Sequence, residues 1–200
     1  MTNAMVRREF FFSLAGVCCV PLRGASALPT PAASERAMTV RGPVPVQDLG
    51  MTLVHEHVMV DFIGADQVRK DRYDPDEVFR AVLPHLARIQ SLGCRTLVEC
   101  TPAYLGRDPV LLTRLSGASG LQLITNTGYY GAAGGKYLPR EAYEESAEQL
   151  AQRWVDEFEE GIDGTGVRPG ILKTGVNKGP LSAIDAKLAR AAALTHKATG

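Results

Sequence analysis

The chain has 200 residues, of which 45% are hydrophobic, a composition typical of a globular domain with a packed core. Its 22 lysines and arginines balance 22 aspartates and glutamates, so the formal net charge at pH 7 is zero. This balance gives no electrostatic reason to expect a nucleic-acid partner or an anionic membrane surface.

The first 27 residues have the pattern of an export signal. An Arg-Arg pair at 7–8 is followed by an apolar stretch over 10–22 and by small residues at 25–27. This pattern is typical of a twin-arginine signal peptide, and the apolar stretch is too short to span a bilayer as a helix. We expect cleavage after Ala27, export to the periplasm or the extracellular space, and no stable membrane span afterwards. An uncleaved N-terminal anchor, or a chance Arg-Arg pair, is the alternative.

A structured domain is expected from residue 44 to residue 200. Residues 28–43 are rich in Pro, Ala and Ser and predict a flexible leader. Beyond them, short apolar runs alternate with longer segments of helical periodicity. The expected strands are Thr52–Val60, Thr96–Thr101, Leu121–Thr127 and Gly170–Gly175. The expected helices are Pro75–Leu92, Pro109–Leu115, Arg140–Glu160 and Ala183–Ala198. This alternation predicts an α/β fold of parallel βα units.

Individual residues support the expected helices. Asp74 and Asp108 each precede a proline, which places a capping carboxylate before a first-turn proline. Pro84 lies inside the first helix and is expected to kink or shorten it. Trp154 has helical spacing with apolar neighbours and is expected in the core.

Two histidines lie near the end of the first expected strand. In a strand, successive side chains alternate faces, so His55 and His57 project from one face while Glu56 points to the other. Two imidazoles held in this way can share one metal ion. A chance strand motif is the alternative for these two residues alone.

Lys173 interrupts the last expected strand, in the segment Gly-Ile-Leu-Lys-Thr-Gly. An uncompensated ammonium on a packed face is costly, so a desolvated lysine has a lowered pKa and can act as a nucleophile. If the neutral amine captures carbon dioxide, the resulting carbamate is an anionic oxygen ligand that can bridge two metals.

Five motifs follow one another in a fixed order along the domain. They are Gly50–His57, Gly93–Thr101, Leu105–Asp108, Asn126–Tyr130 and Ile171–Gly175. This order resembles the phosphotriesterase family, which includes phosphotriesterases, lactonases and phosphotriesterase-homology proteins. The resemblance implies a (β/α)8 TIM barrel, of which only about the first four βα units can be counted here. We therefore expect the N-terminal half of such a barrel.

The resemblance also implies a metal centre and a reaction. His55 and His57 would bind the more buried of two divalent metal ions, and carboxylated Lys173 would bridge both. Zinc is the expected metal, and manganese, cobalt or iron are compatible with the same ligand types. A metal-bound hydroxide would then attack a small-molecule ester, lactone or phosphotriester. The family's further ligands, two histidines and an aspartate on later strands, have no counterpart, because His85 and His196 fall on expected helices.

Two more residues have weaker assignments. The resemblance places Tyr130 near the substrate, with structural packing as the alternative. Glu99 is either a partner of a metal-binding histidine or a capped polar group at a strand end.

Three hypotheses for function remain open at this point. The first is the hydrolase described above. The second is a non-catalytic half barrel that lacks a complete metal centre and pairs with itself, as a homo-oligomer, or with another chain. The third is a mononuclear metal hydrolase or deaminase that uses His55 and His57 alone.

Overall fold

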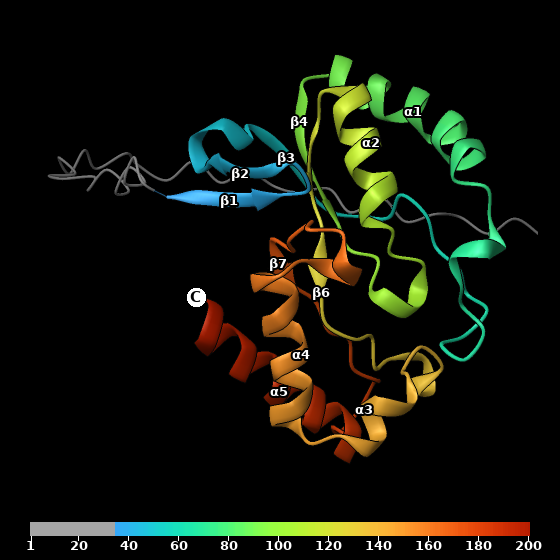
Figure 1. Cartoon of the computed structure of the whole chain (residues 1–200), viewed down its shortest axis with the longest axis vertical. Helices are drawn as coiled ribbons and strands as arrows, with labels where there is room; N and C mark the ends of the chain where they lie inside the picture. Colours follow the sequence, from blue (N-terminus) through green and yellow to red (C-terminus); the bar gives the residue numbers. More distant parts are fainter. Residues whose placement is uncertain (1–34) are drawn as a thin grey trace, which may run out of the picture. The chain divides into compact units, whose positions relative to one another are not determined.

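A computed structural model describes residues 35–200, so the expected export signal lies outside the described residues. The strands are β1 (Arg36–Thr39), β2 (Gly42–Pro45), β3 (Met51–Glu56), β4 (Cys94–Glu99), β5 (Gln122–Ile124), β6 (Asn126–Thr127) and β7 (Ile171–Leu172). The α-helices are α1 (Pro75–Ser91), α2 (Pro109–Ser119), α3 (Arg140–Glu144), α4 (Ala147–Glu159) and α5 (Ala183–Thr199) (Figure 1). None of the helices within residues 35–200 has the length and apolar character needed to cross a membrane.

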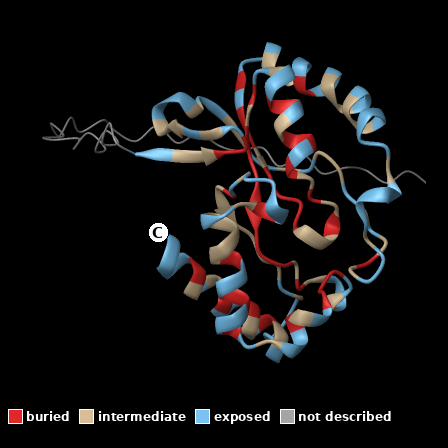
Figure 2. Ribbon diagram, in the orientation of Figure 1, coloured by how far each residue is buried: buried red, intermediate tan, exposed pale blue. Residues whose placement is uncertain are grey.

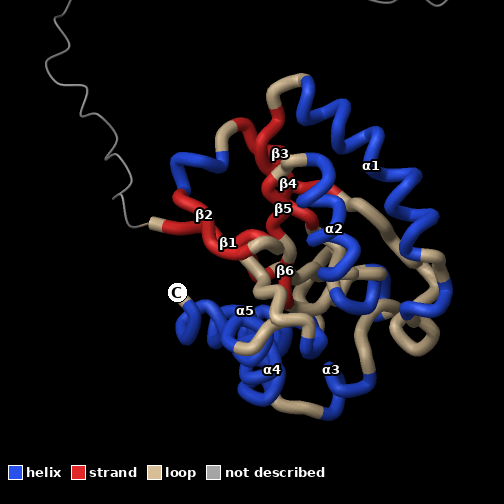
Figure 3. The backbone as a smooth tube through the Cα atoms, turned by 45° about the horizontal axis from the view of Figure 1, so that its top comes forward, coloured by secondary structure: helices blue, strands red, loops and turns tan. Residues whose placement is uncertain are grey.

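The strands from β3 onward run parallel and follow the chain order. β3, β4 and β5 form one sheet (Figure 3). β6 pairs with β7. Only Thr125 separates β5 from β6, so these two short strands occupy one strand position. Each of the four strand positions is followed by one or two α-helices. This arrangement confirms the prediction of four parallel βα units, and in the described part of the chain β3 and β7 each pair on one side only.

Two apolar clusters support this arrangement. The first lies where α1 and α2 cover the sheet, and its fully or nearly fully buried members include Leu97, Leu111, Leu115, Leu121 and Leu123. The second joins α4 and α5 and includes Leu150, Trp154, Leu188 and Ala191. Figure 2 shows buried residues along the central strands and on the facing sides of the helices. Trp154 is only 1% exposed, which confirms its expected place in the core.

The expected helix starts are confirmed by the capping geometry. The carboxylate of Asp108 accepts hydrogen bonds from the backbone N–H groups of Val110 and Leu111, at 3.1 and 3.0 Å. Asp74 accepts one from the backbone of Asp76 at 2.8 Å. Pro84 lies inside α1 without ending it. Proline has no backbone N–H, so one hydrogen bond of α1 is missing at this turn. Apolar side chains of α1 and α2 pack in one cluster and stabilise the helix there.

Several expectations about secondary structure are corrected. The first expected strand ends at Glu56, the last one shortens to Ile171–Leu172, and α2 extends beyond the expected end to Ser119.

The third expected helix is two helices, because Glu145 is extended and Ser146 starts α4 with a capping box completed by Gln149. Residues 36–43, expected in the leader, belong to the antiparallel pair of β1 and β2. Contacts of Val40 explain why this segment is structured. Its side chain is 4% exposed, and its backbone N–H donates to the Leu123 carbonyl at 2.8 Å.

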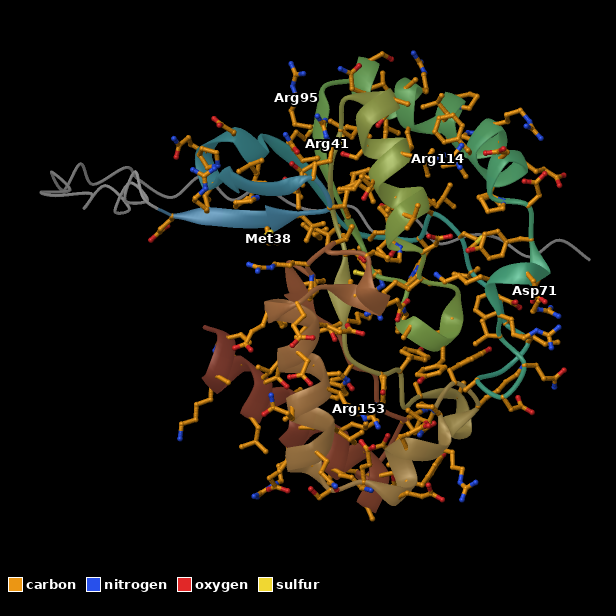
Figure 4. The ribbon with its side chains drawn as sticks, in the orientation of Figure 1. Met38, Arg41, Asp71, Arg95, Arg114 and Arg153 are labelled. Carbon is orange, nitrogen blue, oxygen red and sulfur yellow. The ribbon has the colours of Figure 1, made fainter. Side chains whose placement is uncertain are left out.

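Charged side chains also link the elements. Figure 4 shows Arg114 on α2, and its guanidinium donates to the carboxylate of Asp76 on α1 at 2.6 Å. The buried Arg107, 3% exposed, donates to the Asn126 carbonyl at 2.8 Å and binds the carboxylate of Glu157 on α4 through both terminal nitrogens. This bidentate pair joins the segment after β4 to α4.

We expect Glu157→Ala to lower the free energy of unfolding by about 3–5 kcal/mol, because it leaves the buried guanidinium of Arg107 without its counter-charge. Urea denaturation followed by circular dichroism measures the change. The exposed Glu159, two residues along the same helix, provides the control, and Glu159→Ala should change the value by less than about 0.5 kcal/mol. Equal effects of the two substitutions would show that the Arg107 pair does not stabilise the fold.

Candidate metal centre

The four residues singled out as site residues line one cavity. His55 is on β3, His57 follows the end of that strand, Lys173 follows β7, and Tyr130 follows β6. The cavity has a volume of about 210 Å³. Its other lining residues are Val60, Phe62, Cys100, Thr101, Pro102 and Leu105. The structure therefore brings all four residues together at the carboxyl ends of the strands, where parallel βα folds place their binding sites.

The first and last strand positions meet through a side-chain contact. Lys173 Nζ lies 3.0 Å from His55 Nε2, across 118 residues of chain. The rings of His55 and His57 are 5.3 Å apart between centroids and nearly edge to face. Lys173 is partly buried, whereas both histidine rings remain exposed to the cavity mouth. Two imidazoles and an amine thus converge on one small volume.

Close backbone packing fixes where Lys173 lies. Its N–H donates to the Thr127 carbonyl at 2.8 Å, in register with the pairing of β6 and β7. Gly128 has φ +102°, and a Cβ atom there would lie 2.2 Å from the Lys173 carbonyl oxygen. Position 128 therefore requires glycine, both for its backbone conformation and for the space beside Lys173.

Tyr130 is placed by the same pair of segments. It forms an isolated parallel bridge with Gly175, and a Cβ atom at Gly175 would lie 2.5 Å from the tyrosine ring. The ring is partly buried and lies 6.1 Å from the ring of Tyr137 between centroids. Tyr130 therefore packs against Tyr137 and also lines the cavity, and its contact with a substrate stays a prediction.

Behind His57 lies a buried polar network. His57 Nδ1 is 2.9 Å from Thr101 Oγ1, and that hydroxyl also bonds to a carboxylate oxygen of Glu99. Glu99 is 1% exposed and accepts from the backbone N–H groups of Thr101, at 3.1 Å, and Val58, at 3.3 Å. Glu99 is thus connected to His57 through Thr101, a residue that the sequence did not single out. The only sequence signals for Thr101 are its place as the last residue of the second expected strand and of the motif Gly93–Thr101.

Burial changes the acidity of two of these groups. Desolvation raises the pKa of Glu99 to about 7, and hydrogen bonds from Thr101 and Val58 only partly oppose it. Partial burial lowers the pKa of His57, and the neighbouring Lys173 and His55 lower it further. A neutral His57 is the form that can bind a metal.

The donor set fits one divalent cation better than two. His55 and His57 supply imidazole nitrogens, and a carboxylated Lys173 would supply oxygen. Within residues 35–200 there is no group of three or more His, Cys, Asp or Glu side chains placed to hold a metal. A second ion would have Lys173 as its one ligand among these residues. His85 and His196 are exposed on α1 and α5, as expected for helix-surface residues.

Comparison with known proteins decides the family. The model of the phosphotriesterase family matches residues 35–200. The chain belongs to the phosphotriesterase family. This assignment confirms the resemblance inferred from the five ordered motifs.

The chain matches only about half of each of two relatives within the phosphotriesterase family. The chain is 32% identical over 152 residues to a phosphotriesterase homology protein of Escherichia coli, covering 76% of this chain and 50% of that protein. It is 31% identical over 153 residues to an aryldialkylphosphatase of Saccharolobus solfataricus, with 76% and 48% covered. The chain thus spans about half the length of the curated relatives it matches.

A solved structure gives the same proportion. The organophosphorus hydrolase from Deinococcus radiodurans is similar with a TM-score of 0.75 and 28% identity, over 88% of this chain and 54% of that chain. The matching proteins are TIM barrels, which confirms the expected (β/α)8 fold class with about four of its βα units.

The raised pKa of Glu99 predicts a pH dependence of stability. A carboxyl that titrates near 7 when folded and at 4.5 when unfolded binds more protons in the folded state between these values. Its contribution is fully present below pH 4.5 and is lost as the pH rises to 7. We expect the free energy of unfolding of the wild type to fall by about 3 kcal/mol relative to Glu99→Gln over this range.

Urea denaturation at several pH values measures this difference. His57 acts in the opposite direction, since its lowered pKa makes the folded state bind fewer protons, but both proteins retain it and its effect cancels. Glu159→Gln, at an exposed position, should follow the wild type. Parallel curves for the wild type and Glu99→Gln would contradict the raised pKa.

Proposed function

We propose that this chain forms part of a metal-dependent hydrolase that acts on small-molecule esters, lactones or phosphotriesters. The observation that carries the proposal is the convergence of His55, His57 and Lys173, with Lys173 Nζ 3.0 Å from His55 Nε2. Chance would not bring two imidazoles and a partly buried lysine from the first and last strand positions into one cavity. Membership of the phosphotriesterase family, which includes an aryldialkylphosphatase, supports the reaction class.

Each residue has a separate role in the proposed site. His55 and His57 would hold a divalent cation, and Lys173, carboxylated, would provide an oxygen ligand shared with a second one. When bound, such a cation supplies Lewis acidity to the bond under attack and lowers the pKa of the attacking water. Zinc is the first candidate, and manganese, cobalt and iron accept the same ligands.

The cavity walls would select the substrate. Apolar side chains of Val60, Phe62 and Leu105 line the cavity together with Tyr130. Such walls favour alkyl, acyl or aryl groups of a substrate. The phenol of Tyr130 can donate a hydrogen bond to a carbonyl or phosphoryl oxygen of the substrate.

Export and self-association belong to the same proposal. The Arg-Arg pair at residues 7–8 and the apolar stretch after it support export by the twin-arginine route. Edge strands paired on one side, such as β3, support association with further protein segments, including a second copy of the chain.

Metal analysis of the purified full chain is the first test. We expect at least one bound divalent ion per chain, held by His55 and His57, and an affinity for it at least tenfold weaker in His57→Ala. Lys173→Ala should weaken the binding of this ion and abolish any binding of a second one. The exposed His85 on α1 provides the control, since His85→Ala should retain the wild-type content.

The metal content also separates the rival hypotheses. A wild-type chain without stoichiometric metal would contradict the proposal and favour the non-catalytic half barrel. One ion per chain that Lys173→Ala leaves unchanged would favour the mononuclear hydrolase or deaminase. The second hypothesis has one observation in its favour, namely that the described residues offer a second ion a single ligand.

We further expect the hydroxyl of Tyr130 to contribute to kcat/KM. Tyr130→Phe keeps the ring but loses the hydroxyl, so kcat/KM for a lactone should fall by about tenfold, the effect of one lost hydrogen bond to the substrate. Measurement with a lactone, an aryl ester and an aryl phosphotriester tests this. Tyr143→Phe, at an exposed tyrosine on α3, should leave all three rates unchanged. Equal rates for Tyr130→Phe and the wild type would assign Tyr130 to packing alone.

A further inference from the structure

The hydroxyl of Thr101 is surrounded by groups of known hydrogen-bonding character. Thr101 is 1% exposed, and its Oγ1 lies 3.1 Å from the backbone carbonyl of Met59 and in contact with a carboxylate oxygen of Glu99. The third neighbour is His57 Nδ1, at 2.9 Å. A carbonyl oxygen can only accept a hydrogen bond, and an ionised carboxylate is likewise an acceptor.

These neighbours determine where the protons lie. Both oxygens of Glu99 already accept a backbone N–H, one from Thr101 and one from Val58. When Glu99 is ionised, as at pH 8.5, all its sites are acceptors. The single hydroxyl proton of Thr101 then goes to Glu99 or to Met59, and Oγ1 is left as an acceptor for His57. An acceptor beside Nδ1 requires Nδ1 of His57 to carry a proton.

We propose that Thr101 is a positioning residue that holds His57 in the Nδ1–H tautomer, so that the lone pair of Nε2 faces the cavity. Glu99 and Met59 act through Thr101, because they accept the hydrogen bond that its hydroxyl donates. The consequence for metal binding rests on the proposed function, whereas the tautomer is a property of the protein by itself.

The tautomer matters because only one nitrogen of a neutral imidazole can donate its lone pair to a metal. With Nδ1 bonded to Thr101, that nitrogen is Nε2, and the ring cannot rotate without breaking a hydrogen bond in a buried network. Outer groups of this kind orient metal-binding histidines and raise their basicity. Thr101 would thus organise the site before any ion arrives.

Nitrogen NMR measures the tautomer directly. Long-range ¹H–¹⁵N correlation spectra of the full chain, labelled at histidine and kept at pH 8.5 without metal, distinguish Nδ1–H from Nε2–H. The chain has only four histidines, so a spectrum of His57→Gln assigns the signals of His57. We expect Nδ1–H in the wild type, and an Nε2–H or mixed pattern for His57 would overturn the proposal.

Substitutions test whether Thr101 is the cause. Thr101→Val keeps the shape but removes the hydroxyl, and His57 should lose its preference for Nδ1–H. Thr101→Ser retains the hydroxyl and should restore the wild-type pattern. Thr125→Val is the matched control, because this buried threonine has no hydrogen-bond partner for its hydroxyl among the described residues. If Thr101→Val keeps the Nδ1–H pattern, another group fixes the tautomer and the proposal is wrong.

Zinc titration then separates this inference from the proposed function. We expect Thr101→Val to bind zinc about 10–100-fold more weakly than the wild type, and Thr101→Ser to bind within a few-fold of it. A wild type with the Nδ1–H tautomer but without zinc binding would contradict the hydrolase and leave the role of Thr101 intact. If Thr101→Val does not fold, the wild-type tautomer and its persistence in Thr101→Ser still decide the proposal.

Discussion

Buried polar side chains hold together the carboxyl ends of the parallel strands. The amide of Asn126 at the start of β6 donates to the backbone carbonyls of Glu99 and Thr101 at the end of β4, each at 3.0 Å. Arg107 in turn donates to the Asn126 carbonyl and binds Glu157 on α4. Buried groups of this kind are costly unless each finds a partner, so the network permits few alternative positions for the strand ends. The apolar clusters determine which helices cover the sheet, whereas this polar network determines where the carboxyl ends of the strands lie relative to one another.

Local signals in the sequence were sufficient to predict the order of the helices and strands and the residues at which several of them begin. The Asp-Pro pairs at 74–75 and 108–109 identify helix starts because capping depends on neighbouring residues only. The division between α3 and α4 was also present as a capping box beginning at Ser146, but continuous helical spacing on both sides concealed it. The pair of β1 and β2 was missed since its stability comes from contacts such as that of Val40 with Leu123, far along the chain.

The site shows the same division between local and distant information. The types and spacing of His55 and His57 led to the prediction of a metal site without knowledge of the fold, with a chance strand motif as the alternative for the two residues alone. The sequence also marked Lys173 as unusual, while its partnership with the histidines came from the family resemblance. Thr101 was not predicted as a site residue, because its contact with His57 depends on the pairing of β3 with β4 and a threonine at the end of a strand has no distinctive pattern. Proximity of residues within one strand can therefore be predicted from the sequence, whereas a contact between strands requires the register.

The contact between His55 and Lys173 has a consequence for the mechanics of the fold. The two residues belong to the first and last of the four strand positions, and no backbone hydrogen bonds of the described sheets join β3 to β7. The side-chain contact at 3.0 Å therefore adds a link between the first and last strand positions that the backbone pairing of the described sheets does not supply. A substitution at either residue would remove this link and leave every strand pair intact.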